Sequence, residues 1–248
     1  MPAEFDVIAR HFAPLAGPGG LGLLDDAALL HPLPGHELVV TTDALVAGVH
    51  FFAEDPADTI AGKALGVNLS DLAAKGAEPL GFTLALVMPA GTEEPWLASF
   101  AAGLGRMAEA HGCPLIGGDT VVSPGPLTLS VTAFGSVPES RMVLRGGARP
   151  GDLLFATGHI GDAAIGLQLR LAQRAGGDWA LAADHLAYLT DRYLLPRPRT
   201  GVAAALRRHA SAAMDVSDGF VGDLTKMLAL AGVGADVQLD EVPHSVAA

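Results

Sequence analysis

The chain has 248 residues, half of them hydrophobic, and 27 acidic against 15 basic residues give it a net charge of −12. Such a chain can bury a sizeable core, and its acidity argues against nucleic acid or an anionic membrane as a partner. The single cysteine, Cys113, excludes an internal disulfide and fits an intracellular compartment. Early acids, Glu4 and Asp6, do not fit an export signal. No apolar run approaches the roughly 18 residues of a membrane span, so we expect a cytoplasmic protein.

The first half of the sequence predicts alternating helices and strands. Apolar residues at helical spacing indicate a short amphipathic helix over 5–12, and a strand over 38–42 ends at Asp43. A later helix opens with acids and closes at Gly112. The further elements predicted in this half are a helix over 57–75, a strand over 80–89, a helix over 93–112, and strands over 114–119 and 127–135.

A loop of basic, glycine and proline residues, "RGGARPGD" at 145–152, marks a domain boundary close by. We therefore predict an N-terminal domain over 1–137 and a C-terminal domain over 138–248. The elements predicted in the second are strands over 153–157, 211–216 and 234–239 and helices over 162–174, 177–190, 201–209 and 219–231. This alternation is typical of an α/β or α+β protein in two parts.

Two nucleotide-binding motifs can be set aside. "GPGGLG", at 17–22, matches the dinucleotide fingerprint, but a predicted helix precedes it and an acidic segment follows, whereas the fingerprint needs a strand before and a helix after. The phosphate-binding sequence G-x-x-x-x-G-K-[ST] does not occur in the chain. Any nucleotide site must therefore be built in another way.

Acidic residues in apolar or glycine-rich surroundings are the strongest chemical signal. They stand in "LLDDAAL", "TTDAL", "NLSDLAAKG", "IGGDT" and "DVSDG", mostly at the ends of predicted elements. Any one of them is more simply explained as a helix cap or turn residue. Five such clusters in a weakly charged chain instead favour oxygen ligands for Mg²⁺, which uses a few carboxylates together with water and substrate phosphates. The pattern predicts a magnesium site that handles phosphoryl groups.

The motifs also occur in the order found in a known family. They are "LLDDAALL", "TTDALVAGVHF", "KALGVNLSDLAAKGAEPLGFTLAL", "LIGGDT", "GARPGDLLFATGHIGDAAIGL", "LLPRPR" and "MDVSDGFVGDL". From about residue 4 to residue 245 the chain resembles the thiamine-monophosphate kinases, of the aminoimidazole ribonucleotide synthetase and selenophosphate synthetase superfamily. The resemblance implies an α+β fold of two domains, whose N-terminal sheet pairs with that of a second subunit in a barrel-like homodimer core.

The resemblance also implies the activity and the site. The reaction would be Mg²⁺-dependent phosphorylation of thiamine phosphate by ATP, through direct in-line transfer without a phosphoenzyme or a catalytic protein base. Matched by position, His50 would contact thiamine phosphate, while Gly118, Asp119, Arg145 and Ser217 would contact ATP. The implied magnesium ligands are Asp26, Thr41, Thr42, Asp43, Asp71, Asp119, Asp215 and Asp218.

Two departures from the family pattern are visible. Leu24 stands where the family has a glycine, and a leucine at a position of positive φ would strain the loop that presents Asp26. Family members also continue with a segment that holds the thiamine moiety, whereas this chain stops at Ala248, so we expect weak turnover from residues 1–248 alone. Two alternatives follow: a nucleotide-binding, catalytically impaired or non-catalytic member of the superfamily, or an enzyme that activates another acceptor with ATP.

Overall fold

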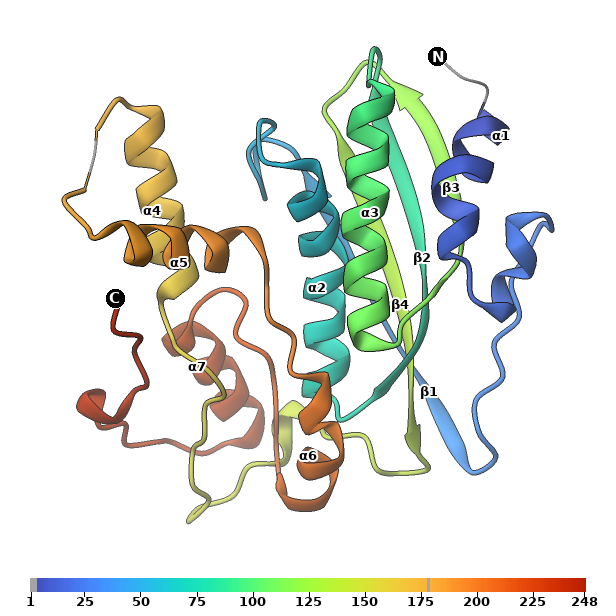
Figure 1. The fold of residues 1–248 in the computed structure, drawn as a ribbon. Coiled ribbons are helices and arrows are strands. Elements are labelled where there is room, and N and C mark those ends of the chain that lie inside the picture. Colours follow the sequence, from blue (N-terminus) through green and yellow to red (C-terminus); the bar gives the residue numbers. More distant parts are fainter. Residues whose placement is uncertain (1–3, 178) are drawn as a thin grey trace.

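The structure, a computed structural model, describes residues 4–177 and 179–248. An open four-stranded sheet lies at the centre of the N-terminal half (Figure 1). Its order is β1-β4-β2-β3, so β1 and β3 are its two edges. β4 is antiparallel to both neighbours, whereas β2 and β3 run parallel. The strands, all four of them predicted, are β1 (His36–Val46), β2 (Glu78–Pro89), β3 (Leu115–Ser123) and β4 (Thr128–Pro138).

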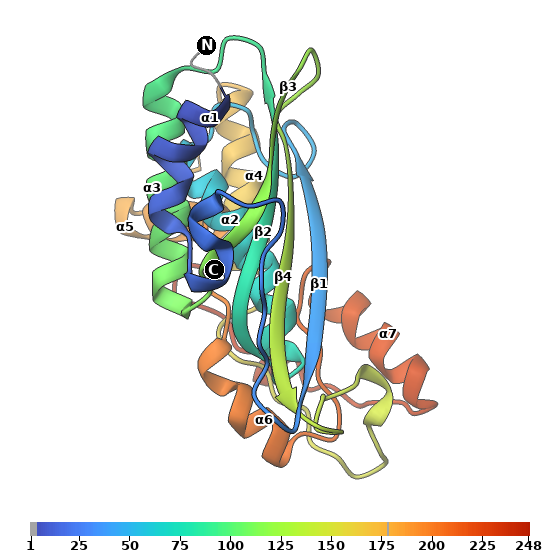
Figure 2. The same ribbon diagram turned by 90° about the vertical axis from the view of Figure 1, so that its right-hand side faces the viewer.

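Two long helices, α2 (Ala57–Ala74) and α3 (Glu94–His111), pack on one face of this sheet (Figure 2). A short helix, α1 (Glu4–Val7), continues into a π-helical turn and lies on the same side. The predicted closure of α3 is confirmed, because Gly112 caps it with a φ of 60°. Fully buried side chains of the helices and strands form the core, among them Leu65, Leu69, Leu72, Phe82, Leu86, Phe100, Leu104 and Leu129.

The other face of the sheet carries no helix from residues 4–137 (Figure 2). Side chains alternate along β2: Leu84, Leu86 and Met88 are buried under the helices, and the residues between them point to the opposite face. The exposed side chains of Leu38 and Val40 show that this face is also open at β1. Within one chain the sheet is therefore not closed into a barrel.

The helices of the C-terminal half lie beside and below α2 in Figure 1. α4 (Asp162–Arg174) and α5 (Ala183–Leu194) pack against each other, followed by α6 (Ala203–His209) and α7 (Phe220–Ala231). Of these, α5 and α6 pack against α2. No helix of the described residues is long and apolar enough to cross a membrane.

Four predictions for this half are wrong. The segments 153–157, 211–216 and 234–239 are irregular rather than strands, and the helix predicted over 177–190, of which residue 178 lies outside the described residues, begins at Ala183. A run of apolar and β-branched residues indicates that a segment can form a half-buried strand. The strand forms only where another segment pairs with its backbone hydrogen-bonding groups. Within the described residues none of these three segments pairs with a strand, since the single backbone hydrogen bond from Ala213 to Leu144 does not form a ladder, and Phe155 is 83% exposed.

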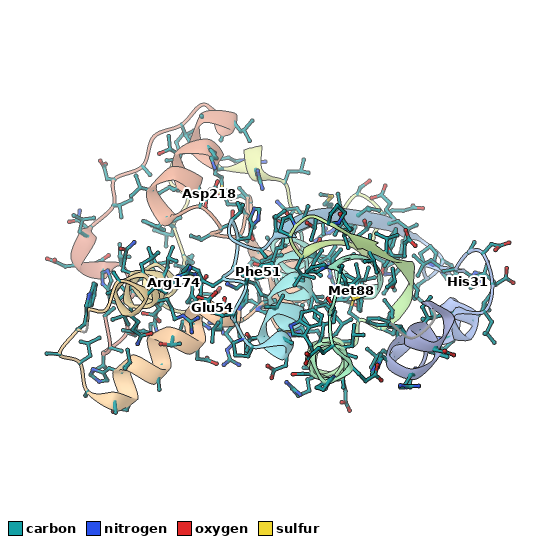
Figure 3. All side chains as sticks on the ribbon, turned by 90° about the horizontal axis from the view of Figure 1, so that it is seen from above. His31, Phe51, Glu54, Met88, Arg174 and Asp218 are labelled. Atoms are coloured by element: carbon teal, nitrogen blue, oxygen red, sulfur yellow. The ribbon has the colours of Figure 1, made fainter. Side chains whose placement is uncertain are left out.

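Ion pairs join the two halves beside the turn that leads into α2. Arg170 of α4 donates to the buried carboxylate of Asp55 at 2.5 Å, and Arg174 pairs with Glu54 at 2.8 Å (Figure 3). Both guanidinium groups lie over the ring of Phe52. The turn that carries His50 is therefore fixed from the C-terminal side.

Candidate functional site

Asp71 lies where β1 meets α2, and it connects several of the predicted ligands. The hydroxyl of Thr41 donates to its carboxylate at 2.6 Å. Thr41 and Asp43 are both partly buried and, being two residues apart on β1, point to the same face of the sheet. Burial, and secondarily the negative charge of Asp71, raises the pKa of Asp43. The hydroxyl of Thr41 and the carboxylates of Asp43 and Asp71 thus lie near one another where the edge strand β1 meets α2.

The C-terminal half adds a third carboxylate to this group. Burial raises the pKa of Asp215, and the charge of Asp71 raises it further, while a hydrogen bond with Ser70 and the charge of Arg145 act in the opposite direction. The charge of Asp71 therefore acts on both Asp43 and Asp215, although the three residues are far apart in sequence. Negative charge gathered around Asp71 in this way is charge that a bound cation would neutralise.

Lys75 is a charged residue of this site that the sequence analysis did not identify. Its ammonium donates to the carbonyl oxygen of Ala213 at 2.7 Å. Burial and then the charge of Arg145 lower the pKa of Lys75, and the charges of Asp71 and Asp215 raise it. The only signal in the sequence was its position one helical turn after Asp71, in "SDLAAKG".

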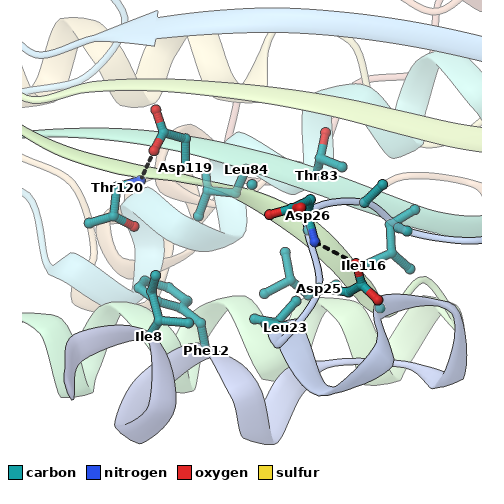
Figure 4. A pocket seen from close by; sticks show the side chains of 16 residues that line it. Ile8, Phe12, Leu23, Asp25, Asp26, Thr83, Leu84, Ile116, Asp119 and Thr120 are labelled. Atoms are coloured by element: carbon teal, nitrogen blue, oxygen red, sulfur yellow. Dashed lines mark hydrogen bonds between the residues drawn. The ribbon is translucent and has the colours of Figure 1, made fainter. Parts of the chain in front are cut away.

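A second group of predicted residues lies around a cavity of about 240 Å³ beside β3 (Figure 4). Asp26 and Asp119 line this cavity, and both are exposed. The amide of Asp26 donates to Asp25 at 2.8 Å, and that of Thr120 donates to Asp119 at 2.9 Å. The wall across from Asp119 is apolar, and the residues that make it include Ile8, Phe12 and Leu23 (Figure 4).

Gly118 brings β3 close to its neighbour at this cavity. A Cβ atom at this position would lie 2.0 Å from the carbonyl oxygen of Leu84 on β2, a distance that real contacts do not reach. No larger residue fits without moving a strand. The requirement for glycine is thus explained by packing within the sheet, while its place on the cavity wall keeps the backbone open to a ligand.

The strain anticipated at Leu24 does not occur there. Leu24 has a φ of −108°, in the ordinary right-handed region, and its side chain is 92% exposed. The positive φ values fall instead on Leu21, at 51°, and Leu23, at 57°. Left-handed backbone costs a non-glycine residue roughly 1–2 kcal/mol, so the loop before Asp26 is strained at two neighbouring leucines.

His50 and Thr42 occupy separate positions near the group at β1. The amide of Val46 donates to Nδ1 of His50 at 3.0 Å, which leaves Nε2 as the protonated nitrogen of the neutral ring. Thr42 faces the open side of the sheet, where its hydroxyl lies 3.0 Å from that of Thr132. Thr42 therefore does not join Thr41 beside Asp71.

The "DVSDG" loop is organised by Asp223, another residue that the sequence analysis missed. One carboxylate oxygen of Asp223 accepts the backbone amides of Ser217, Asp218 and Gly219 at 3.0–3.2 Å. These hydrogen bonds, and that from Lys226, lower the pKa of Asp223, which burial by itself would raise. The side chain of Asp218 is exposed and pairs with Lys226 at 2.6 Å.

The predicted magnesium ligands are therefore not one preformed cluster. Across residues 4–177 and 179–248, no three His, Cys, Asp or Glu side chains are grouped closely enough to hold a metal ion. One row of paired residues crosses the four strands, from Ala44 on β1 through Ser130 and Ala85 to Asp119 on β3. The groups at β1 and β3 are therefore separated by three strand spacings, about 14 Å. The donors nevertheless fit Mg²⁺ chemically, because they are carboxylate and hydroxyl oxygens. The carboxylates also bring negative charge that a cation would balance.

Comparison with known proteins places the chain in a family. A family described as AIR synthase related protein matches the chain with its N-terminal domain over residues 24–137 and its C-terminal domain over residues 149–247. The thiamine-monophosphate kinase of Caulobacter vibrioides is 45% identical over 246 residues, which cover 98% of this chain and 68% of the relative.

Solved structures show the same likeness. The thiamine-monophosphate kinase from Stenotrophomonas maltophilia K279a has a TM-score of 0.83 at 43% identity, covering 91% of this chain and 70% of that one. AaThiL complexed with AMPPCP and TMP has a TM-score of 0.80 at 30% identity, covering 92% of this chain and 75% of that one. The fold and its acidic site define a two-domain protein of the AIR synthase related class. Within that class, the chain belongs to the thiamine-monophosphate kinase family.

Proposed function

We propose that this protein transfers the γ-phosphoryl group of ATP to thiamine phosphate, giving thiamine diphosphate and ADP for the biosynthesis of that cofactor. The observation that supports this most directly is the position of Asp71 at the junction of the two halves of the chain, where it accepts a hydrogen bond from Thr41 and its charge acts on both Asp43 and Asp215. In a family named for this kinase reaction, such a group is suited to binding the cations that accompany nucleotide phosphates.

The proposal assigns roles to the residues of both groups. Arg145 would clamp a phosphate of ATP with its planar fork of donors, and the backbone at Gly118, Asp119 and Ser217 would contact the nucleotide. His50 would donate from Nε2 to the phosphate of thiamine phosphate. The residues whose side chains would hold Mg²⁺ are Asp26, Thr41, Asp43, Asp71, Asp119, Asp215 and Asp218, whereas the side chain of Thr42 faces the open side of the sheet and would not take part. When bound, Mg²⁺ supplies charge neutralisation at the phosphates.

No protein base is needed in this reaction. The acceptor is a phosphate monoester, whose second pKa near 6 leaves it mostly doubly ionised at neutral pH. One of its oxygens forms a bond to the γ-phosphorus of ATP while the bond to the departing ADP breaks, in line and without a phosphoenzyme. The protein holds the two reactants in position and neutralises their charge, and the candidate site offers both functions.

The proposal also includes the assembly and the location of the protein. We place the domain division between residues 137 and 138, and the two family matches, ending at 137 and starting at 149, support it. The uncovered sheet face supports a homodimer in which two sheets form a barrel-like core. The single cysteine supports a cytoplasmic location.

The test is a product assay with ATP, Mg²⁺ and a wide range of thiamine phosphate concentrations. We expect thiamine diphosphate and ADP in equal amounts, with formation of both abolished by EDTA. Other phosphorylated acceptors, tested in the same assay, should give no ADP. If the protein binds Mg²⁺ and ATP but makes no thiamine diphosphate at any acceptor concentration, it is a non-catalytic nucleotide-binding member of its superfamily instead.

A further inference from the structure

Lys75, the residue that follows α2, holds two other segments of the chain at once. Its carbonyl oxygen accepts the amide of Val143 at 3.1 Å, and its ammonium donates to the carbonyl oxygen of Ala213 at 2.7 Å. These two segments are also bonded to each other, because the amide of Ala213 donates to the carbonyl oxygen of Leu144 at 3.1 Å. Three hydrogen bonds thus join the end of α2, residues 143–144 and residue 213.

Each of the joined segments leads directly to a residue of the candidate site. Val143 precedes Arg145 by two positions, Ala213 precedes Asp215 by two positions, and Lys75 follows Asp71 by one helical turn. We propose that Lys75 is a positioning residue, whose side chain holds the backbone before Asp215 against the end of α2 so that Asp215 lies beside Asp71. This inference rests on the proposed function for its effect on ligands, although the contact itself does not.

The chemistry of the contact suits this role. The ammonium of Lys75 donates to a main-chain carbonyl and not to Asp71 or Asp215, so it fixes the segment while leaving the carboxylate oxygens available to a ligand. Its partly buried positive charge also offsets some of the repulsion between the two acids, since both of them act on its pKa. A methionine at this position would fill a similar volume, but it would neither donate a hydrogen bond nor carry a charge.

Arg207 of α6 offers a matched control. Its guanidinium donates to the carbonyl oxygen of Gly76 and to the carboxylate of Glu78, the latter at 2.7 Å, so it also joins the C-terminal half to the segment after α2. It lies eight positions before Asp215 in the chain, and its side-chain hydrogen bonds go to Gly76 and Glu78 rather than to residues 213–215. Arg207→Met therefore removes a similar contact between the halves without touching the proposed positioning contact.

Two measurements on Lys75→Met, Lys75→Arg and Arg207→Met test the inference. The first is hydrogen exchange of peptides that cover residues 211–218, without any ligand. We expect exchange to be at least about fivefold faster in Lys75→Met, close to wild type in Arg207→Met, and intermediate in Lys75→Arg, which keeps a donor and a charge. Equal exchange in Lys75→Met and wild type would overturn the positioning role, whatever the protein's activity.

The second measurement is calorimetric titration with a non-hydrolysable ATP analogue at fixed Mg²⁺ concentration. We expect Lys75→Met to weaken binding at least tenfold, about 1.4 kcal/mol, and Arg207→Met to change it less than twofold even if both variants melt at lower temperature. Equal weakening in the two variants would overturn the link to the site. A wild-type protein that binds the analogue but makes no thiamine diphosphate contradicts the proposed function alone.

Discussion

At the scale of single residues, Asp71 links the two halves of the candidate site. It accepts a hydrogen bond from Thr41, and its charge raises the pKa values of Asp43 and Asp215. It stands on a helix of the N-terminal half, while Asp215 belongs to the C-terminal half. The negative charge of Asp71 is therefore shared by both parts of the site.

Asp71→Asn should weaken Mg²⁺-dependent ATP binding at least tenfold, about 1.4 kcal/mol. The amide keeps the shape of the side chain but removes the charge that a cation would bind. Calorimetric titration of ATP with and without Mg²⁺ measures the effect. Asp58→Asn is the control, because Asp58 lies on the same helix and loses the same charge, but pairs with the surface residue Arg106 at 2.6 Å. Equal affinities in the two variants would contradict the assignment of Asp71.

Lys63 provides a prediction about pH. Burial lowers its pKa from the ordinary 10.5 to about 8, although Asp55 acts in the opposite direction. Between these values the unfolded chain binds a proton that the folded protein has lost, so stability rises with pH in this window. The shift from 10.5 to about 8 corresponds to roughly 3–4 kcal/mol at most. The ring of Tyr193, 3.9 Å from the ammonium, stabilises the charge and reduces this effect.

Lys63→Met should therefore be more stable than wild type at pH 7, and the difference should shrink as the pH rises from 8 to 10. Urea denaturation at several pH values gives the two free energies of unfolding. Lys226→Met is the comparison, because the pKa of Lys226 is raised by its pairing with Asp218 and Asp223, so its difference from wild type should not shrink over that range. A constant difference between Lys63→Met and wild type would show that Lys63 titrates normally.

At the scale of elements, the approach of α2 to α3 depends on one glycine. A Cβ atom on Gly103 of α3 would lie 2.2 Å from the carbonyl oxygen of Asp58 in the first turn of α2. The two helix backbones are therefore in direct contact at this point. Since α2 carries Asp71 and Lys75 on or just beyond its last turn, the packing of α3 helps to place the site.

Gly103→Ala should destabilise the fold by about 1–3 kcal/mol, because the added methyl group forces these helices apart. Gly222→Ala is the matched control: Gly222 lies in α7 with no atom within 4 Å of an added Cβ. In that helix, alanine should be neutral or stabilising by up to about 1 kcal/mol. Thermal and urea unfolding of both variants measure the difference. A Gly103→Ala variant as stable as Gly222→Ala would show that the helices can separate at little cost.

Elements with strong periodicity and a partner nearby could be predicted from the sequence. This holds for the four strands of the sheet and for α2, α3, α4 and α7. The prediction of three strands in the C-terminal half was wrong, because the apolar content of a segment does not show which other segment will pair with it.

The residues grouped around Asp71 stand in the motifs that the sequence analysis singled out. Their separation from Asp26 and Asp119 could not be predicted, because strand order is a property of the whole sheet. Lys75 and Asp223 could not be predicted as site residues, because their side chains bond to main-chain atoms, which every residue has.

At the scale of the whole molecule, one face of the sheet is left uncovered by this chain. Exposed Leu38 and Val40 on β1 and Val121 on β3 place apolar side chains at both edges. Thr83, Ala85 and Val87 of β2 lie on the same face, which holds small and apolar side chains with few charges. Faces of this kind are usually covered by another sheet or helix, and a second copy of the chain offers a surface of the same composition.

We therefore predict that the protein is a dimer at micromolar concentration and that Val40→Glu dissociates it. Val40 is 57% exposed in the single chain, so glutamate at this position should not unfold the monomer, but two buried carboxylates in a symmetric interface would cost several kcal/mol. Val221→Glu is the control, since Val221 is 72% exposed on α7, outside the sheet. Sedimentation velocity should show a dimer for wild type and Val221→Glu and a folded monomer for Val40→Glu. A wild-type protein that sediments only as a monomer, or a Val40→Glu variant that remains dimeric, would place the interface elsewhere or remove it.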